Sequence, residues 1–434
     1  MNAAHIPAAT ACSYPRRDGN HVRPLISSSS AFHRIERAIE EARHSIWLTV
    51  TFYADDFRFP AGRSSLFDML DRAVARGLDV RILFWRHNPE SSAYGRTFWG
   101  TAEQRDMLRS RGSRVRMRWD RAAGAFCQHQ KSWVFDAGTA SETAFVGGIN
   151  PTAAAFGRHD AYVEVTGPSA TDVHHNFAQR WNGASERHVA DGNWGCDGAD
   201  ELPMPVTVSA AQGKSIVQIQ RMLHPGRYPD IMQGERSVLE QYLAAFDAAR
   251  RTIYLENQAL PIPLIAEHLL KALERGVEII LLVPAIPEDH VFAARRNPER
   301  RPLFETIEAL GRHPTFRLAG IARREEQARR PAYVHGKLAI VDDSWATIGS
   351  CNLHAYSLGG SSEMNASIWD PAVANGLRQA LFAQHLGRPT EGLDDVQALR
   401  LFREIADENA RRNERKDPDW QGQAFTLSAA AYGI

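Results

Sequence analysis

The chain contains one structural unit twice, and this duplication constrains its fold more than any other feature. The stretch FHRIERAIEEARHSIWLTVTFY, which starts at Phe32, has helical and then strand-like spacing, and an amphipathic helix, a glycine and a buried strand follow it. The stretch SVLEQYLAAFDAARRTIYLENQAL, which starts at Ser237, is followed by the same elements in the same order. A spacing of roughly 205 residues separates the copies and drifts by only a few residues along the unit. This pattern predicts an α/β fold made of two similar α/β/α-sandwich lobes with pseudo-twofold symmetry and an active site at the lobe interface.

The pattern also predicts the limits of the domains. Residues 32–182 form the first lobe and residues 215–388 the second, and the Gly- and Asp-rich stretch 183–214 between them is predicted to be a linker. Residues 1–31, which include SSSS at positions 27–30, are predicted to be a poorly ordered N-terminal segment. Residues 389–434 are predicted to be a C-terminal tail with one helical stretch.

Composition narrows the class of protein. A chain of 434 residues with 44% hydrophobic and 24% charged residues is typical of a soluble globular protein. Its 51 basic residues balance 51 acidic ones, so no global charge attracts a nucleic acid or an anionic membrane. Four cysteines without a CxxC pair indicate neither a disulfide scaffold nor a zinc site. The sequence shows no secretory signal and no long apolar run, which favours a cytoplasmic or peripheral-membrane location, with signal-independent export as an alternative.

A short motif recurs at matching positions of the two copies. QHQKSWVFD and VHGKLAIVD both have the spacing H-x-K-x4-D, which gives His129, Lys131 and Asp136 in the first copy and His335, Lys337 and Asp342 in the second. The chain has only five lysines against 46 arginines, and chance alone would give such a motif about 0.01 times per chain. A small-residue turn and an asparagine follow each motif, as Gly147, Gly148 and Asn150, and as Gly349, Ser350 and Asn352.

The spacing within the motif has a chemical meaning. Side chains alternate along a strand, so a histidine and a lysine two residues apart point to the same side. One such pair from each lobe would surround a phosphate group with two imidazoles and two ammonium groups. One histidine can attack phosphorus while the other carries a proton, and the lysines supply positive charge without a metal.

These residues resemble those of the phospholipase D superfamily, whose signature is the duplicated H-x-K-x4-D motif. The resemblance covers residues 32–388. The stretches HDAYVEVTGP, IYLENQ and YVHGKLAIVDD resemble the lipid-hydrolysing branch more than the nucleases of the superfamily. The resemblance implies two lobes with the active site between them and a two-step mechanism through a phosphohistidine.

The resemblance also implies roles for individual residues. His129 is expected to be the nucleophile, and His335 the general acid that later acts as a base. Lys131 and Lys337 are expected to hold the phosphate oxygens with help from Asn150 and Asn352. Each histidine of the family is hydrogen-bonded to a carboxylate downstream of its own motif, and Asp160 and Glu363 occupy those positions.

Other residues of the pattern have weaker assignments. Asp136 and Asp342 are expected to be structural and to tie a strand to a turn, together with the small residues of the two turns. In IYLENQ, Glu256 and Gln258 are candidate substrate-binding residues. No group of residues has metal-ligand spacing, so neither a metal nor another cofactor is expected.

The sequence favours a phospholipase D that hydrolyses glycerophospholipids to phosphatidic acid and a free headgroup, with transfer to another alcohol as a side reaction. A cardiolipin-synthase-like phosphatidyl transferase is an alternative, against which the missing transmembrane segments count. The neutral net charge counts against a nuclease, and the two intact motifs count against an inactive membrane-binding module. The expected partners are a phospholipid and, transiently, a membrane surface, but no nucleic acid. The protein is expected to be a monomer because one chain carries both motifs.

Overall fold

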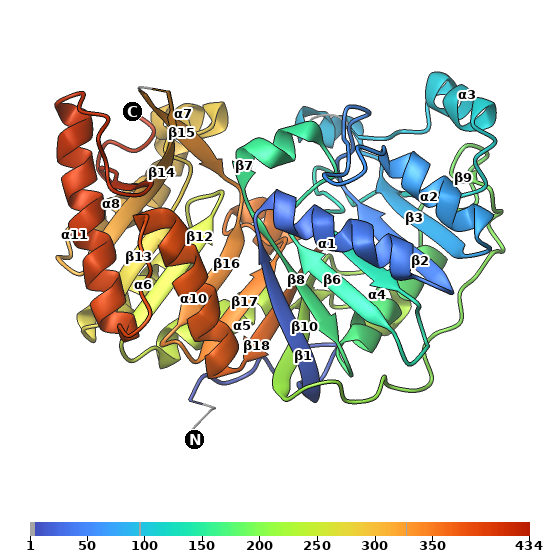
Figure 1. The fold of residues 1–434 in the computed structure, drawn as a ribbon, viewed down its shortest axis with the longest axis horizontal. Helices are drawn as coiled ribbons and strands as arrows, with labels where there is room; N and C mark the ends of the chain where they lie inside the picture. The colour runs from blue at the N-terminus through green and yellow to red at the C-terminus, as the bar shows by residue number, and fades with distance from the viewer. Residues whose placement is uncertain (1–4, 95–96, 327) are drawn as a thin grey trace.

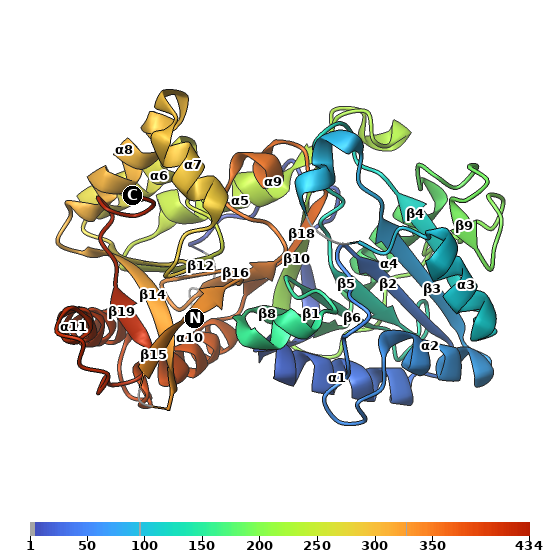
Figure 2. The same ribbon diagram turned by 90° about the horizontal axis from the view of Figure 1, so that it is seen from above.

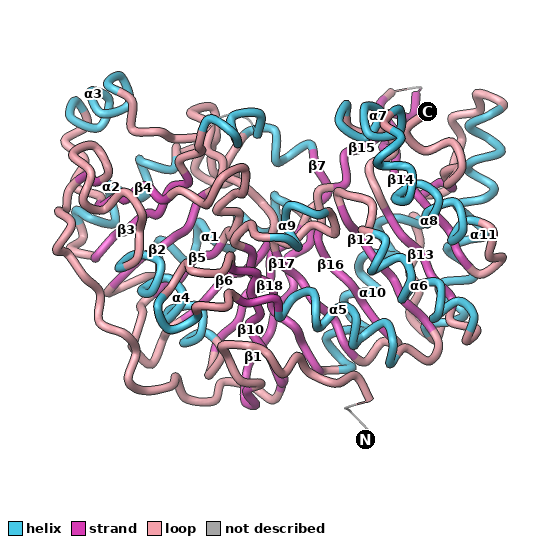
Figure 3. Tube along the Cα trace, turned by 180° about the vertical axis from the view of Figure 1, so that it is seen from behind, coloured by secondary structure: helices cyan, strands magenta, loops and turns pink. Residues whose placement is uncertain are grey.

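The structure, a computed structural model, describes residues 5–94, 97–326 and 328–434. Two halves of similar architecture lie side by side, the first coloured blue to green and the second yellow to red in Figure 1. Each half contains a twisted sheet with helices on both of its faces (Figures 2 and 3). The predicted α/β class is therefore confirmed.

The two sheets repeat one strand order. In the first half the order is β1 (Arg17–Ile26), β8 (Ala161–Thr166), β6 (Thr143–Gly147), β5 (Ser132–Phe135), β2 (Ser45–Val50), β3 (Asp79–Trp85), β4 (Arg116–Asp120) and β9 (Asn193–Trp194). In the second half it is β10 (Ser215–Leu223), β18 (Glu363–Trp369), β17 (Trp345–Gly349), β16 (Lys337–Val341), β12 (Thr252–Asn257), β13 (Glu278–Leu282), β14 (Phe316–Glu325) and β19 (Ala424–Thr426). In both halves three strands are parallel, namely β2, β3 and β4 and their counterparts β12, β13 and β14. The two predicted lobes thus have equivalent topology.

Helices enclose both faces of each sheet. In the first lobe α1 (Ser28–Glu41) and α2 (Leu66–Ala75) cover one face and α4 (Ala170–Asn182) covers the other. Adjacent residues of β2 show the alternation, because Leu48 packs into the α1–α2 core whereas Trp47 packs against α4. In the second lobe α5 (Ser237–Ala248), α6 (Pro263–Glu274) and α8 (Arg301–Gly311) oppose α10 (Pro371–Leu386) and α11 (Asp395–Glu414).

The N-terminal segment differs from its prediction. Instead of being poorly ordered, residues 17–26 form β1, which pairs with β8 of the first lobe and with β10 of the second. Strand β1 therefore joins the two sheets edge to edge. The serines at 27–30 begin α1, since the side chain of Ser27 accepts a hydrogen bond from the amide of Ser30. The composition of this segment suggested disorder, but its apolar residues Val22 and Leu25 are buried.

The C-terminal residues extend the second lobe. Helix α11 packs on the sheet through Phe402, which is buried beside Phe382 and Tyr254. Strand β19 then pairs with β14 at the sheet edge. Among the described residues, no helix is both long enough and apolar enough to cross a membrane.

Candidate active site

The two H-x-K motifs occupy equivalent places at the lobe interface. Strand β5 runs antiparallel to β2 and β16 runs antiparallel to β12, so both motifs lie at the carboxyl ends of the parallel strands. Ligand sites of open α/β sheets commonly lie at this edge. His129, Lys131, His335 and Lys337 are 8%, 1%, 4% and 1% exposed, respectively, so the four groups lie in an environment that largely excludes water.

The carboxylates that bind the histidines are exchanged between the lobes. Nδ1 of His129 lies 2.9 Å from both carboxylate oxygens of Glu363, which belongs to the second lobe. Nδ1 of His335 lies 2.5 Å from Oδ2 of Asp160, which belongs to the first. The prediction that each histidine pairs with the carboxylate downstream of its own motif is therefore wrong. The pseudo-twofold arrangement places the motif of one lobe against strand β8 or β18 of the other. The backbones of the two lobes are also in contact there, since the amide of His129 donates to the carbonyl of Ser362.

The two carboxylates are held in different ways. Glu363 accepts hydrogen bonds from the hydroxyls of Ser350 and Ser357, each at 2.5 Å. Asp160 accepts one from the amide of Ala161 at 2.8 Å. The first lobe has Gly148 where the second has Ser350, and a Cβ atom there would come within 2.5 Å of the Asp160 carboxylate. The two histidine–carboxylate pairs are therefore chemically unequal.

The small residues of the turns are required by close packing. A Cβ atom on Gly147 would lie 2.5 Å from the carbonyl oxygen of Ala161, and one on Gly349 would collide with Asn365. These glycines let the turn approach the neighbouring strand, which brings each carboxylate to its histidine.

The lysines are anchored beside the histidines. Nζ of Lys131 donates to the carbonyl of His129 at 2.6 Å, and Nζ of Lys337 donates to that of His335 at 2.5 Å. Lys337 also donates to Oε1 of Gln258 at 2.9 Å, so this residue of IYLENQ does reach the site. Each ammonium group keeps donor capacity that an anion could use.

The asparagines differ in their pairing. Oδ1 of Asn150 accepts the amide of Phe52 at 3.1 Å. Oδ1 of Asn352 is buried and has no partner among the described residues. Both asparagines are buried close to the motifs.

Asp136 and Asp342 lie away from the histidines, at the far ends of β5 and β16. The Asp136 carboxylate accepts the amides of Arg43, His44 and Ser45, at the start of β2. The Asp342 carboxylate accepts the three equivalent amides at the start of β12, those of Arg250, Arg251 and Thr252. Each aspartate thus fixes the start of the strand beside its motif.

Burial and mutual charge shift the ionisation of the site. Burial lowers the pKa of Lys131 to about 8 and that of Lys337 to about 7. Burial also lowers the pKa of both histidines, and Lys337 adds to the effect on His335. The pKa of Asp160 is raised by burial to about 6. Burial would raise the pKa of Glu363 too, but His129, Lys131 and Ser350 lower it on balance. Glu363 is therefore the more firmly ionised carboxylate.

Glu256 does not face the motif side chains. Its fully buried carboxylate instead accepts hydrogen bonds from Nε2 of His159 at 2.6 Å, Nε2 of His385 at 3.0 Å and the hydroxyl of Tyr254 at 2.7 Å. His159, Glu256 and His385 lie close enough together to be considered as metal ligands. The sequence showed no such group because the three residues are far apart in the chain.

Sequence reasoning also missed three residues at the edge of the site. Ser357 and His354 come from α9 (Ala355–Gly359) and its N-cap, and burial lowers the pKa of His354 to about 4 near the charges of Glu363 and His129. Arg158 precedes His159, and its positive charge acts on His335 and Lys337. No short motif identifies these residues, because the fold alone brings them to the site.

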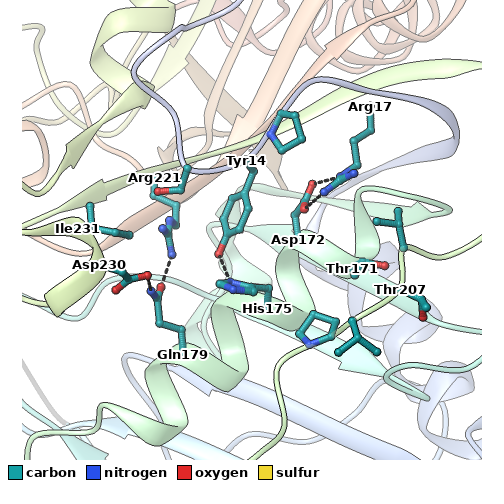
Figure 4. Close-up of a pocket in the computed structure, with 15 residues that line it drawn as sticks. Tyr14, Arg17, Thr171, Asp172, His175, Gln179, Thr207, Arg221, Asp230 and Ile231 are labelled. Carbon is teal, nitrogen blue, oxygen red and sulfur yellow. Dashed lines mark hydrogen bonds and ion pairs between the residues drawn. The ribbon is translucent and has the colours of Figure 1, made fainter.

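A separate cavity of about 450 Å³ lies between the N-terminal segment, α4 and the end of the interlobe stretch (Figure 4). Its polar side chains are bound to one another. Arg17 forms two hydrogen bonds with Asp172, Tyr14 contacts His175, and Gln179 accepts from Arg221. None of the described residues that line it belongs to either motif, so it is distinct from the histidine site.

Comparisons with known proteins agree with this geometry. A family described as "Cardiolipin synthase, PLD-like domain" matches residues 35–181 and 242–385, which is more than half of the chain. Together, the two equivalent lobes and the paired motifs define an enzyme with phosphodiesterase-type chemistry. The chain belongs to the phospholipase D superfamily.

Individual relatives cover different shares of the chain. Cardiolipin synthase A of Pseudomonas putida (strain GB-1) is 24% identical over 376 residues, 83% of this chain and 68% of that protein. Cardiolipin synthase B of Salmonella typhimurium (strain LT2) is 25% identical over 380 residues, 84% of this chain and 80% of that protein. Phospholipase D alpha 1 of Cynara cardunculus is 25% identical over 320 residues but covers 53% of this chain and 40% of that protein. The crystal structure of phosphatidylserine synthase from Haemophilus influenzae Rd KW20 superposes with a TM-score of 0.57 at 15% identity, covering 94% of this chain and 97% of that one, which supports the fold.

These relatives correct the expected function. The sequence favoured a hydrolytic phospholipase D, but relatives that cover 83–84% of the chain are named cardiolipin synthases. The physical reason for the error is that a phosphohistidine reacts with water and with an alcohol through the same catalytic groups. The motif therefore identifies the transfer of a phosphoryl group to histidine, but it does not show whether water or an alcohol accepts that group.

Proposed function

We propose that this protein is a phosphatidyl transferase of the cardiolipin-synthase type, which moves a phosphatidyl group from one phospholipid to the alcohol of another. The observation that carries the proposal is the crossed pair of buried histidine–carboxylate contacts, flanked by two lysines with donor capacity to spare. The names of the widely matching relatives support the alcohol as acceptor. The burial of the four motif side chains supports it as well, because limited water access favours an alcohol bound close to the intermediate.

In the first step His129 attacks the phosphorus of the donor lipid. The hydrogen bond from Nδ1–H to Glu363 leaves Nε2 of His129 with its lone pair free. The Nε2–P bond forms as the bond from phosphorus to the headgroup oxygen breaks, and His335 gives its proton to that oxygen. Lys131 and Lys337 neutralise the charge on the remaining phosphoryl oxygens.

In the second step the headgroup alcohol leaves and the acceptor alcohol takes its place. His335, now neutral, takes the acceptor's proton while the acceptor oxygen attacks phosphorus and the bond to Nε2 of His129 breaks. His129 returns to its starting form and His335 to its protonated form, so protons and charges balance over the cycle.

The unequal carboxylates support this division of roles. A nucleophilic histidine benefits from a carboxylate that stays ionised, and Glu363 is held so by His129, Lys131 and the Ser350 hydroxyl. A proton carrier benefits from a partner that can share the proton, and burial raises the pKa of Asp160 to about 6. Burial lowers the pKa of His335, but a bound phosphodiester anion would favour its protonated form.

The test is an assay on vesicles of phosphatidylglycerol, in which transfer gives one cardiolipin and one glycerol for each two lipids consumed. We expect equal amounts of the two products from the wild-type protein. His129→Ala should reduce both products by about 10³-fold or more, because the covalent step is lost. Glycerol release with phosphatidic acid and no cardiolipin would contradict the proposal, as would His129-dependent cleavage of DNA or RNA with the lipids left intact.

A further inference from the structure

The proton-transfer half of the site is connected to a buried carboxylate that neither motif contains. We propose that Glu256 is a positioning residue that, through His159 and His385, holds Asp160 and His335 in the geometry needed for proton transfer. This inference rests on the proposed function, because it assigns to Glu256 an effect on the proton transfer by His335 and not on the attack by His129.

Glu256 is the centre of a closed hydrogen-bond cluster. It lies on β12 and is fully buried, and it accepts hydrogen bonds from Tyr254 of the same strand, from His159 on β7 (Arg158–His159) and from His385 on α10. Burial alone would raise the pKa of this carboxylate, but the two histidines hold it well below its usual range. Because His159 belongs to the first lobe and the other residues to the second, the cluster joins the lobes. Figure 1 shows β7 where the two halves meet.

The cluster is directly bonded to the segment that carries His335. The backbone carbonyl of His159 accepts the amides of His335 at 2.7 Å and Gly336 at 2.9 Å. The residue after His159 is Asp160, which contacts Nδ1 of His335 at 2.5 Å. A Cβ atom on Gly336 would lie 3.0 Å from Oε2 of Glu256, so the turn packs tightly on the carboxylate. The position of the His159 backbone, which the ring anchors to Glu256, is thereby linked to both partners of the proton-transfer pair.

Among its described residues, the first lobe has no equivalent of this cluster. Strand β2 has Thr49 at the place of Glu256, and the hydroxyl of Thr49 contacts that of Ser132 at 3.0 Å. The carboxylate that serves His129 is held instead by the serine hydroxyls of the second lobe. A defect at Glu256 should therefore affect His335 selectively.

The hydrogen bonds of the cluster favour this reading over a metal site. Both Nε2 atoms already contact Glu256, and both Nδ1 atoms lack partners among the described residues. A histidine that binds a metal through one ring nitrogen normally donates a hydrogen bond from the other. Two rings that each donate from Nε2–H to Glu256 account for the contacts of this carboxylate without a metal.

The test uses Glu256→Gln and two donor lipids that differ in their leaving group. Phosphatidyl-p-nitrophenol releases a stable anion and needs no proton from His335, whereas phosphatidylglycerol releases an alkoxide that must be protonated. In Glu256→Gln we expect the first-turnover release of p-nitrophenol to stay within about threefold of wild type. Steady-state cardiolipin formation from phosphatidylglycerol should fall by about 10- to 100-fold, with KM little changed.

Glu142→Gln is the matched control. Glu142 also forms a buried pair with a histidine, at 2.7 Å to Nδ1 of His174 on α4. This pair lies beside the loop after Asp136, at the end of β5 opposite to His129 and Lys131. This variant should leave the activities on the two lipids unchanged, whatever its effect on stability. If Glu256→Gln does not fold, His385→Gln, which keeps a donor for Glu256, can be compared with His385→Leu, which does not. His385→Leu should then show the selective loss.

Equal losses on both lipids in a folded variant, or no loss on either, would overturn the proposal. So would a purified wild-type protein that holds one equivalent of zinc, measured by elemental analysis, and loses it in Glu256→Gln. If the wild-type protein processes neither lipid, the proposed function has failed instead, and the two failures are distinguishable.

Discussion

At the scale of single residues, two histidines with the same local sequence pattern have different surroundings. His129 contacts a glutamate that also receives two serine hydroxyls, whereas His335 contacts an aspartate with one backbone donor. The difference arises from Ser350, where the first lobe has Gly148, and from Ser357 on α9. Because carboxylate partners set the basicity of an imidazole, the lobes can perform different steps with the same motif.

We expect a covalent intermediate to accumulate on His129 when His335 is replaced. In His335→Ala the activated donor phosphatidyl-p-nitrophenol should still phosphorylate His129, but the acceptor alcohol would lack its base, so removal of the phosphatidyl group should slow by about 10²- to 10⁴-fold. Mass spectrometry of peptides from a reaction quenched with base should locate an acid-labile adduct. An adduct on a residue other than His129 would contradict the assignment of His129 as the nucleophile. His129→Ala is the control and should give no adduct.

The pH dependence of kcat/KM should show the low pKa values of the lysines. Burial lowers the pKa of Lys337 to about 7 and that of Lys131 to about 8, so the ammonium charge is lost at a lower pH than in an exposed lysine. Activity should therefore decline as the pH rises through this range. Lys337→Arg keeps its charge, so its decline should begin at a higher pH although its maximum is lower.

Lys271→Arg, at an exposed position on α6, is the control for this profile and should reproduce the wild-type curve. An alkaline limb that does not move in Lys337→Arg or in Lys131→Arg would mean that another group limits activity.

At the scale of elements, strand β1 joins the two sheets, although the composition of this segment suggested disorder. We expect Leu25→Ala to lower the free energy of unfolding by about 2–5 kcal/mol, because Leu25 is buried in the core of the first lobe. Arg23→Ala, at an exposed position two residues away on the same strand, should change it by less than about 0.5 kcal/mol. Urea unfolding measures both. Equal, small effects would mean that this strand contributes little to the fold.

The elements inside the repeat could be predicted because each carries its own signal. The helical and alternating apolar patterns identified α1, β2, α5 and β12, and the duplicated motif located β5 and β16. Strand β1 precedes the repeat that the sequence reveals, and its stability comes from partners in β8 and β10 that no local pattern shows. For the same reason α11 and β19 could not be placed on the second sheet.

The candidate site, too, could be predicted only in part from the sequence. Spacing identified the histidines and lysines, and the family resemblance pointed to both carboxylates, but neither could show that Glu363 contacts His129 and Asp160 contacts His335. That exchange depends on how the lobes face each other. Glu256 was a candidate substrate-binding residue because IYLENQ resembles the family, whereas the structure encloses its carboxylate between His159 and His385. Its partners are distant in the chain and share no motif.

At the scale of the whole molecule, the lobes are packed as one unit. One apolar cluster extends from α4 of the first lobe, through β10 and β18, to α10 and α11 of the second. Polar contacts across the same boundary include both histidine–carboxylate pairs. Such continuity predicts that neither lobe unfolds alone.

We therefore expect a single unfolding transition in urea. Tryptophan fluorescence, circular dichroism and residual activity should give the same midpoint. Leu25→Ala in the first lobe and Phe402→Ala in the second, the latter costing about 3–5 kcal/mol, should both move that one midpoint to lower urea concentration. Two separated transitions, with each variant moving a different one, would show that the lobes are independent.

The exchange of carboxylates has a consequence for how such a chain could have arisen. A single ancestral unit would have carried a histidine whose proper carboxylate lay on another copy, so it could have worked only when two copies met face to face. Fusion of two such copies would have made that meeting permanent and freed each half to change separately. The pairs Ser350 and Gly148, and Glu256 and Thr49, differ between the halves as such divergence would require.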